Sequence, residues 1–454
     1  MTVLPSRWKG DPLPANKVPP AIGTQWDWVV VALPTALASR IYNPVVSLSA
    51  IALLVSISMI RKPDGKFPIQ PGPLLCLYIA VGIVFCRPDT YPIPTTGLMV
   101  GILILQLITT VDARKIITSL FDGLGTLMVL NVIGHALGLE SPYRKIGATN
   151  LTGGRILFPL SNSVNYLPNA AAACFVASIF LLRGATGSKR LFRLTYAPSA
   201  FLILFSSGSR TALAVAVVLA VFAILAPSVS RWIGQVSAVL AAISAFTLPS
   251  IMESIGSAIT PLATLNPLRA ADEGGIISFQ GRAEIWHNVI NYWTEKVTGL
   301  GDNAFGFGEL GQFHSGVSST YIHIVYTLVD PHPDYANVHN SFLEQFVDGG
   351  FIGWFFFLAA IIWASARLST RRLQWGNFAL AATFAMTTVL LGSTTEAFLA
   401  PGACGESFWI VSILVGVACQ KPALPKIVPP STTVVGSAPS AAMTASAAIP
   451  SSGQ

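Results

Sequence analysis

The sequence predicts an all-α polytopic membrane protein with about 12 transmembrane helices and one large periplasmic loop. Hydrophobic residues make up 52% of the 454 residues and charged residues only 10%, whereas soluble domains carry about 25% charged residues. Apolar segments recur along the chain at close to the length needed to cross a bilayer, roughly 17 to 25 residues of helix. Basic residues gather in one set of the connections between these segments.

The membrane helices are predicted to start directly after a short polar segment. Residues 1–25 are Pro-rich and lack the apolar core of a removable secretory signal, so we predict a cytoplasmic N-terminal segment. The predicted spans are residues 26–41, 44–60, 73–87, 95–110, 116–139, 166–183, 192–206, 211–227, 232–250, 341–366, 377–397 and 404–419. They form two transmembrane regions, 26–250 and 341–419, separated by the long connection 251–340.

The basic residues set the expected orientation. With the N-terminus inside, the short cytoplasmic connections hold 13 Lys and Arg residues and the short outer connections hold 6. Because cytoplasmic connections carry the excess of Lys and Arg, we expect both termini in the cytoplasm and residues 251–340 in the periplasm. Most of the net charge of +7 then reflects topology, aided by anionic lipid, and does not indicate nucleic acid binding.

The long loop and the C-terminal tail differ in composition. In the loop, apolar residues recur at helical spacing between Ile285 and Trp293 and include Trp286. This pattern predicts an amphipathic helix near the membrane interface with its tryptophans as anchors. Residues 420–454 are rich in Pro, Ala, Ser and Thr and are predicted to be a disordered cytoplasmic tail. The five cysteines lack CxxC spacing and are interpreted as packing residues.

Four polar clusters lie on the outer side, where polar groups at the membrane are costly unless they meet a partner or a substrate. The first is a turn of serines and a glycine from Ser206 that ends at Ser209 and Arg210. Arg210 is either an interface arginine that reaches lipid phosphates or a diphosphate clamp, that is, a residue that binds a diphosphate group of the substrate. The second role suits arginine because guanidinium is a planar, permanently charged donor. The second cluster runs from Gly153 through Arg155 and Asn162 to Asn165, and it is either a ligand-binding loop or a helix cap.

Two further clusters lie in and after the long loop. The third begins at Gly281 and Arg282 and continues into a glycine-rich run. No strand precedes this run and it lies on the side without ATP, so a nucleotide site is disfavoured. The fourth is His339, Asn340 and Glu344, at the start of the span 341–366. His339 is either part of a helix cap with Asn340 or a general base near neutral pH.

The loop before His339 holds further histidines and carboxylates but no recognisable metal set. These residues are His323, Asp330, His332 and Asp334. Their spacing matches no HExxH-like pattern and nothing fixes a coordination geometry. We therefore expect no metal and no cofactor.

The order of the motifs along the chain resembles a known family. Ser207-Gly208-Ser209-Arg210, then Gly281-Arg282 with Trp286, then a glycine-rich turn, then His339-Asn340 with Gly350 and Gly353, is similar to the O-antigen ligase and Wzy-type polysaccharide polymerase superfamily. The resemblance covers roughly residues 150–400. It implies a GT-C-like, metal-independent glycosyltransferase of the bacterial inner (cytoplasmic) membrane, whose donor is a glycan on undecaprenyl diphosphate.

The resemblance also implies roles for single residues. Arg210 and Arg282 would grip the diphosphate, and His339 would orient or deprotonate the acceptor hydroxyl. Further candidates for substrate binding are Arg155, Asn162, Ser209, Asn340 and Glu344. Two carboxylates at outer span ends, Glu396 and Glu406, either shape the sugar pocket or cap helices.

The sequence favours polymerisation of lipid-linked repeat units over ligation to lipid A core. Ligases of this superfamily tend to carry a small residue where this chain has Phe356. A transporter or flippase would also have twelve spans, but it would carry ionisable groups near the midplane and related halves. A non-catalytic scaffold would not need two outer arginines and a histidine. The expected partners are the undecaprenyl-diphosphate-linked glycan and membrane lipid, with a chain-length regulator and a flippase as candidate protein partners and no nucleic acid.

Overall fold

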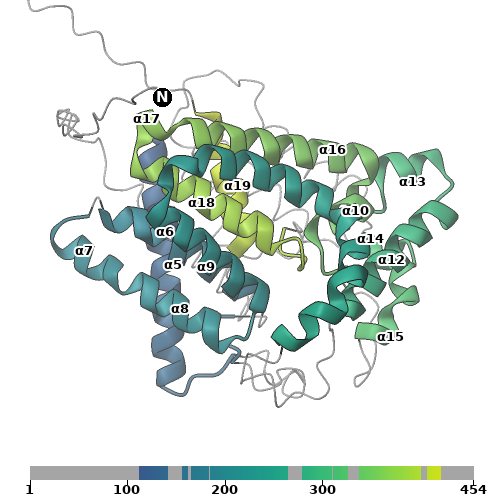
Figure 1. Ribbon diagram of the computed structural model, residues 1–454, viewed down its shortest axis with the longest axis horizontal. Coiled ribbons are helices and arrows are strands. Elements are labelled where there is room, and N and C mark those ends of the chain that lie inside the picture. Colours follow the sequence, from purple (N-terminus) through teal and green to yellow (C-terminus); the bar gives the residue numbers. More distant parts are fainter. Residues whose placement is uncertain are drawn as a thin grey trace, which may run out of the picture. The chain divides into compact units, whose positions relative to one another are not determined.

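The structure is a helical bundle throughout the part of the chain that it describes. The computed structural model describes residues 112–141, 156–161, 165–183, 185–263, 279–308, 310–325, 337–399 and 406–420 (Figure 1). Within these ranges there are helices and no strand, which confirms the predicted all-α class. Among the described residues, four helical segments are long and apolar enough to cross a membrane. They are α5 (Ala113–Ala136), α6 (Tyr166–Arg183), the segment Pro227–Ile251, which includes the first part of α10 (Ser230–Ala263), and α16 (Ser341–Thr370).

Most predicted spans that fall in the described residues are found as helices. α6 coincides with the predicted span 166–183. Shorter apolar helices occupy three other predicted spans: α9 (Arg210–Leu225), α18 (Asn377–Gly392) and α19 (Glu406–Cys419). The predicted spans 26–41, 44–60, 73–87 and 95–110 lie outside the described residues, as does the predicted tail beyond Gln420.

The predicted span 192–206 is divided into two helices. α7 (Gly187–Leu194) ends at Thr195, and α8 (Tyr196–Ser206) follows directly. Pro198 accounts for the break, because proline has no N–H for the carbonyl four residues earlier and its ring clashes with that carbonyl. At the junction the Thr195 amide bonds to the carbonyl of Phe192, three residues back, as in a tightened helix end.

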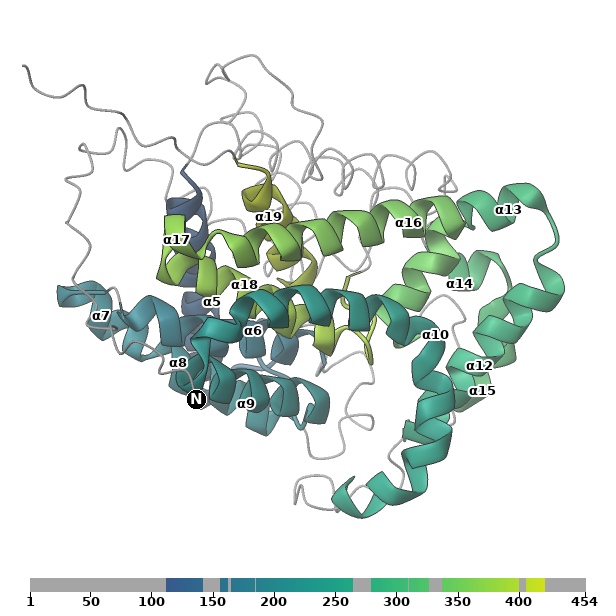
Figure 2. The same ribbon diagram turned by 45° about the horizontal axis from the view of Figure 1, so that its top comes forward.

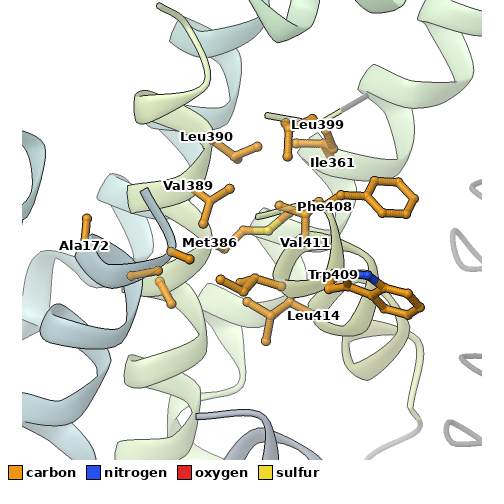
Figure 3. Packing of buried hydrophobic residues seen from close by; sticks show 14 of the residues in the cluster. Ala172, Ile361, Met386, Val389, Leu390, Leu399, Phe408, Trp409, Val411 and Leu414 are labelled. Atoms are coloured by element: carbon orange, nitrogen blue, oxygen red, sulfur yellow. The ribbon is translucent and has the colours of Figure 1, made fainter. Parts of the chain in front are cut away.

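Small residues let α6 pack closely against its neighbours, as is usual between membrane helices. Ala170, Ala171, Ala172 and Ala173 are fully buried, and α6 contacts α5, α8, α9, α18 and α19. The Asn169 side chain donates a hydrogen bond of 3.1 Å to the Ser407 hydroxyl of α19. Figure 3 shows part of the apolar core, with Met386 of α18 beside Val411 of α19.

Helices of the long loop pack on α10 and α16. α10 has 34 residues, or about 51 Å at 1.5 Å per residue, which exceeds a hydrocarbon core of about 30 Å. A short 3₁₀ turn, η5 (Pro227–Val229), joins it to α9. α12 (Phe279–Lys296) packs on α10, and α13 (Leu300–Phe305) and α14 (Gly311–His314) pack on α16 (Figures 1 and 2). Two further short helices of the loop follow, η6 (Val317–Thr320) and α15 (Ile322–Val325).

The predicted amphipathic helix is present as α12, but its expected use of tryptophans as membrane anchors is wrong. Trp286 is fully buried and Trp293 is 6% exposed, so neither ring reaches lipid. Trp286 donates to the Val338 carbonyl at 2.9 Å, and Trp293 donates to the Asn303 side chain at 2.9 Å. The apolar face of this helix therefore packs inside the protein, because α10 and α16 cover it.

The helix ends form two sets of contacts at opposite ends of the bundle. At one end basic side chains tie helices together: Arg114 donates to the Gln374 carbonyl at 2.6 Å, Arg371 to Gln420 at 2.9 Å and Arg372 to Pro227 at 3.4 Å. α17 (Arg372–Trp375) lies in this region. The other end gathers the starts of α6 and α16 and the segment after α18, residues 393–399.

Candidate active site

His339 is held in an unusual backbone conformation directly before α16. Its φ of 54° places it in the left-handed region, which only a few per cent of non-glycine residues adopt. The side chain of Asn337 accepts a hydrogen bond from the His339 amide at 3.0 Å. Asn340 caps α16, since its side-chain oxygen accepts from the amides of Phe342 and Leu343 at 2.9 and 3.1 Å. Strained backbone of this kind concentrates at functional sites.

Glu396 binds the side chain of His339. Its Oε2 lies 2.9 Å from His339 Nδ1. When an ionised carboxylate accepts from the Nδ1–H, the proton-free lone pair is on Nε2. His339 is then held in the tautomer that can take a proton at Nε2.

Arg282 pairs with the other oxygen of the same carboxylate. Its Nη2 forms an ion pair with Glu396 Oε1. Arg282 lies one turn before Trp286 on α12, and the Trp286 indole is bonded to the residue that precedes His339. One helix of the long loop therefore fixes both Arg282 and the backbone at His339.

The segment that carries Glu396 is attached to the start of α16 by Ser341. The Ser341 hydroxyl donates to the Glu396 carbonyl at 2.8 Å and accepts from the amides of Phe398 and Leu399 at 2.7 and 3.1 Å. The Ser341 amide donates to the Ser393 carbonyl at 2.9 Å. These bonds fix the position of Glu396 relative to His339.

The three side chains are largely removed from solvent. Exposed fractions are 7% for Glu396, 11% for His339 and 14% for Arg282. A buried carboxylate is costly unless it is paired and hydrogen-bonded, and Glu396 has both partners. From the sequence alone, Glu396 is either a pocket residue or a helix cap. The sequence feature that points to Glu396 is a carboxylate at the end of an apolar span. This feature does not show which residues Glu396 contacts.

Arg210 is the first residue of α9 and follows Ser209, whose backbone is extended and whose side chain makes no capping bond. Within the described part of the chain, the buried Nε of Arg210 has no hydrogen-bond partner. The same is true of Arg282 Nε. Each guanidinium thus has a donor for a ligand oxygen. The other two predicted residues of this region, Arg155 and Asn162, lie outside the described residues.

Arg210 lies at the same end of the bundle as His339. The Ile156 amide donates to the Ser206 carbonyl at 3.0 Å, which places the end of α8 beside the segment that leads into α6. At the start of α6, the Tyr166 ring makes an edge-on contact with Phe398 at 5.4 Å, two residues from Glu396. The turn before α9 and the segment 393–399 therefore both lie at the end where α6 begins.

Two of the predicted substrate-binding residues are buried in the first turns of α16. Asn340 is fully buried and uses its oxygen as the helix cap, while its Nδ2 has no partner in the described structure. The Glu344 side chain is also buried. The cap expected as an alternative role for this segment is present, and it belongs to Asn340, while the His339 ring bonds to Glu396.

The glycine-rich run supports a break in α16. Gly350 has φ 59° and ψ −165°, which interrupts the helix and leaves carbonyls without helical partners. The Phe307 amide donates to the Val347 carbonyl at 3.1 Å, and the Gly308 amide donates to the Asp348 carbonyl at 2.9 Å. The Asp348 side chain accepts from the Gly311 amide at 2.9 Å. Because glycine has no side chain, Gly308 and Gly311 allow the loop backbone to approach α16 closely.

The described residues contain no group of three or more His, Cys, Asp or Glu side chains that could hold a metal ion. Asp330, His332 and Asp334 lie outside the described residues. What the described residues bring together is a histidine, a carboxylate and an arginine, with a second arginine at the same end.

Comparison with known proteins agrees with the motifs. The family model described as O-Antigen ligase matches residues 196–358, from the start of α8 into α16. The matched segment includes Arg210, Arg282 and His339. A search of curated proteins gave no match. This match supports the resemblance indicated by the motifs: residues 196–358 of this chain are similar to the O-antigen ligase family.

Proposed function

We propose that this protein is a membrane glycosyltransferase that polymerises undecaprenyl-diphosphate-linked oligosaccharide repeat units at the periplasmic face of the inner membrane. The observation that carries the proposal is the bridge made by Glu396, which joins a histidine base to an arginine. The match to the O-antigen ligase family supports glycosyl transfer as the reaction class.

In the proposed reaction the acceptor hydroxyl attacks the anomeric carbon of the donor sugar. Its proton passes to Nε2 of His339 as the new glycosidic C–O bond forms. The bond between the anomeric carbon and the phosphate oxygen breaks, and undecaprenyl diphosphate leaves with the bonding electrons. A base on the face opposite the leaving group gives inversion at the anomeric carbon.

Arg210 and Arg282 stabilise the leaving diphosphate in this proposal. Fixed cations in a site with little water stabilise developing negative charge more than they do in bulk water. With His339 neutral, two arginines and one glutamate give a formal charge of +1. Proton transfer to His339 raises it to +2 as negative charge develops on the diphosphate. The two guanidinium groups thereby supply positive charge of the kind that metal ions supply in other phosphate enzymes.

The distribution of basic residues supports a periplasmic site. Arg114, Arg371 and Arg372 lie at the bundle end opposite His339, and cytoplasmic connections are the ones enriched in Lys and Arg. The diphosphate would then lie at the outer leaflet with the undecaprenyl chain along the apolar helices.

Ligation of the lipid-linked glycan to lipid A core is the second candidate function. The description of the matching family favours it. Phe356 favours the polymerase, because ligases tend to have a small residue at this position. Both reactions use the same donor and the same base, so they differ only in the acceptor.

The lipid-linked pool of a deletion strain distinguishes the two functions. Loss of a polymerase should leave single repeat units on undecaprenyl diphosphate and abolish long polysaccharide, because only elongation stops. Loss of a ligase should leave long chains on undecaprenyl diphosphate and an unmodified lipid A core. Gel electrophoresis and mass spectrometry of the extracted lipids measure both. Long undecaprenyl-linked chains in the deletion strain would rule out the polymerase.

A further inference from the structure

α7 exposes apolar side chains that no other described part of the chain covers. Exposed fractions are 71% for Leu191, 50% for Phe192 and 49% for Leu194. These side chains occupy the helix face opposite Arg193, the one buried residue of α7. The exposed residues Lys189 and Arg190 flank the apolar face on its two sides. A short helix with an apolar face bordered by cations is typical of segments that lie in a membrane interface.

Arg193 fixes α7 to the bundle. Its Nε and Nη2 donate to the two carboxylate oxygens of Asp122 on α5 at 2.8 and 2.9 Å. Its Nη1 donates to the Leu181 carbonyl at the end of α6, at 3.3 Å. A two-pronged arginine–carboxylate pair is geometrically specific. α7 is therefore held with Arg193 toward the protein and Leu191 on the opposite, outward side.

The position of α7 along the bundle corresponds to the level of lipid headgroups. α6 starts at the end that holds His339 and has 18 residues, or about 27 Å of helix, close to the thickness of a hydrocarbon core of about 30 Å. α7 starts four residues after α6 ends. Its outward face is thus placed where the acyl region meets the headgroups.

The exposed charged side chains described on α7 and at the end of α6 are basic. Arg183, Lys189 and Arg190 are exposed there, and the sequence contains no Asp or Glu between Glu140 and Glu253. Asp122, the acid that α7 contacts, is paired with Arg193. Basic residues beside an apolar face are complementary to phosphates of anionic lipids.

We propose that α7 is a binding site for anionic phospholipid, at the membrane face opposite the candidate active site. Leu191, Phe192 and Leu194 enter the boundary of the acyl region. Lys189 and Arg190 bind headgroup phosphates, with Arg183 beside them. This inference does not depend on the reaction that the protein catalyses.

Native mass spectrometry of the full-length protein tests whether Lys189 and Arg190 bind anionic lipid. The protein is released from nanodiscs of phosphatidylcholine with or without phosphatidylglycerol, and retained lipid is counted. The wild type should retain phosphatidylglycerol in preference. The double variant Lys189→Gln/Arg190→Gln should lower this preference roughly 30-fold, since each basic residue near an anionic surface contributes about a five-fold factor. Lys296→Gln, which removes an exposed charge from α12, should not change it. An unchanged preference in the double variant would overturn the proposal.

Accessibility of a spin label tests the apolar face separately. Leu191→Cys is labelled in a full-length background without the five native cysteines. Oxygen, which concentrates in the acyl region, should broaden its signal more than a water-soluble nickel complex. Ser319→Cys, an exposed position in the long loop, should show greater access to nickel. A label at position 191 with the access of a residue in water would overturn the lipid assignment and leave a protein partner as the occupant of this face.

Discussion

At the scale of single residues, Glu396 has two tasks in the candidate site. It sets the tautomer of His339 through Nδ1 and holds Arg282 through its other oxygen. His339, Arg210 and Arg282 could be predicted because their motifs occur in a recognisable order along the chain. Glu396 was noticed only as a carboxylate at a span end, because its partners are 57 and 114 residues away. No local sequence pattern specifies that Glu396 contacts His339 and Arg282.

The arginines provide the first prediction at this scale. Arg210→Ala and Arg282→Ala should each lower polymer formation by about 10² to 10³, the usual effect of removing one donor to a transition-state charge. Lysine at either position should restore little, because it lacks the planar fork. Polymer is measured on gels at matched expression, with Lys296→Ala on α12 as the control. Near-normal polymer from both alanine variants would exclude the diphosphate clamp.

The second prediction at this scale concerns His339 and Glu396. His339→Ala should lower the rate of glycosyl transfer by about 10² to 10⁴. Glu396→Gln should cost about 10- to 100-fold, the range for hydrogen bonds to a charged group. Glu284→Gln, an exposed carboxylate on α12, should have no effect.

A double-mutant cycle separates the two roles of Glu396. If the glutamate acts partly through the histidine, Glu396→Gln should lower the transfer rate less in a His339→Ala background than in the wild type. Full additivity of the two substitutions would contradict a positioning role toward His339.

At the scale of elements, the break in α16 and the loop that supports it form one unit. A helix interrupted at a glycine leaves carbonyls that need partners, and the amides of Phe307 and Gly308 provide them. Both glycine groups stand out in the sequence, but nothing in the sequence shows that they meet. The division between α7 and α8 was missed in a similar way, since the apolar pattern continues through Pro198.

Two glycines with similar backbone angles test this unit. Gly350 and Gly376 both have positive φ, 59° and 56°. A Cβ on Gly350 would lie 2.5 Å from the Gly306 amide nitrogen, whereas one on Gly376 would meet nothing within 4 Å. Gly376→Ala should therefore cost only backbone strain, about 1 to 3 kcal/mol, and Gly350→Ala should cost more. Thermal unfolding in detergent compares the stabilities of the two variants. Equal melting temperatures would show that the loop does not pack closely against α16 at Gly350.

At the scale of the whole molecule, the bundle has a basic end and an end that holds the candidate site. Composition and charge placement predicted this polarity because membrane insertion acts on the sequence itself, through apolar length and the location of Lys and Arg. The packing of α6 against α18 and α19 could not be predicted. It depends on small residues such as Ala170 to Ala173 that fit many partners equally well.

Cysteine labelling tests the proposed orientation. In a cysteine-free background, an impermeant maleimide should label Ser319→Cys in the long loop of intact spheroplasts, because this loop is proposed to be periplasmic. Ser188→Cys on α7 should be labelled only after permeabilisation. Both positions are exposed, so access is not limited by folding. Labelling of position 188 from outside would reverse the orientation and move the candidate site to the cytoplasmic face.

Gly392 illustrates how the interior of the bundle can control its chemistry. A Cβ at this position would overlap the Asn169 side chain of α6, and Gly392 lies four residues before Glu396, one residue before the Ser393 carbonyl that holds Ser341. A larger side chain there would displace the segment that presents the carboxylate without touching substrate. A genetic screen for loss of polysaccharide should therefore recover alleles at Gly392 beside those at His339, and suppressors of such alleles should include smaller residues at position 169.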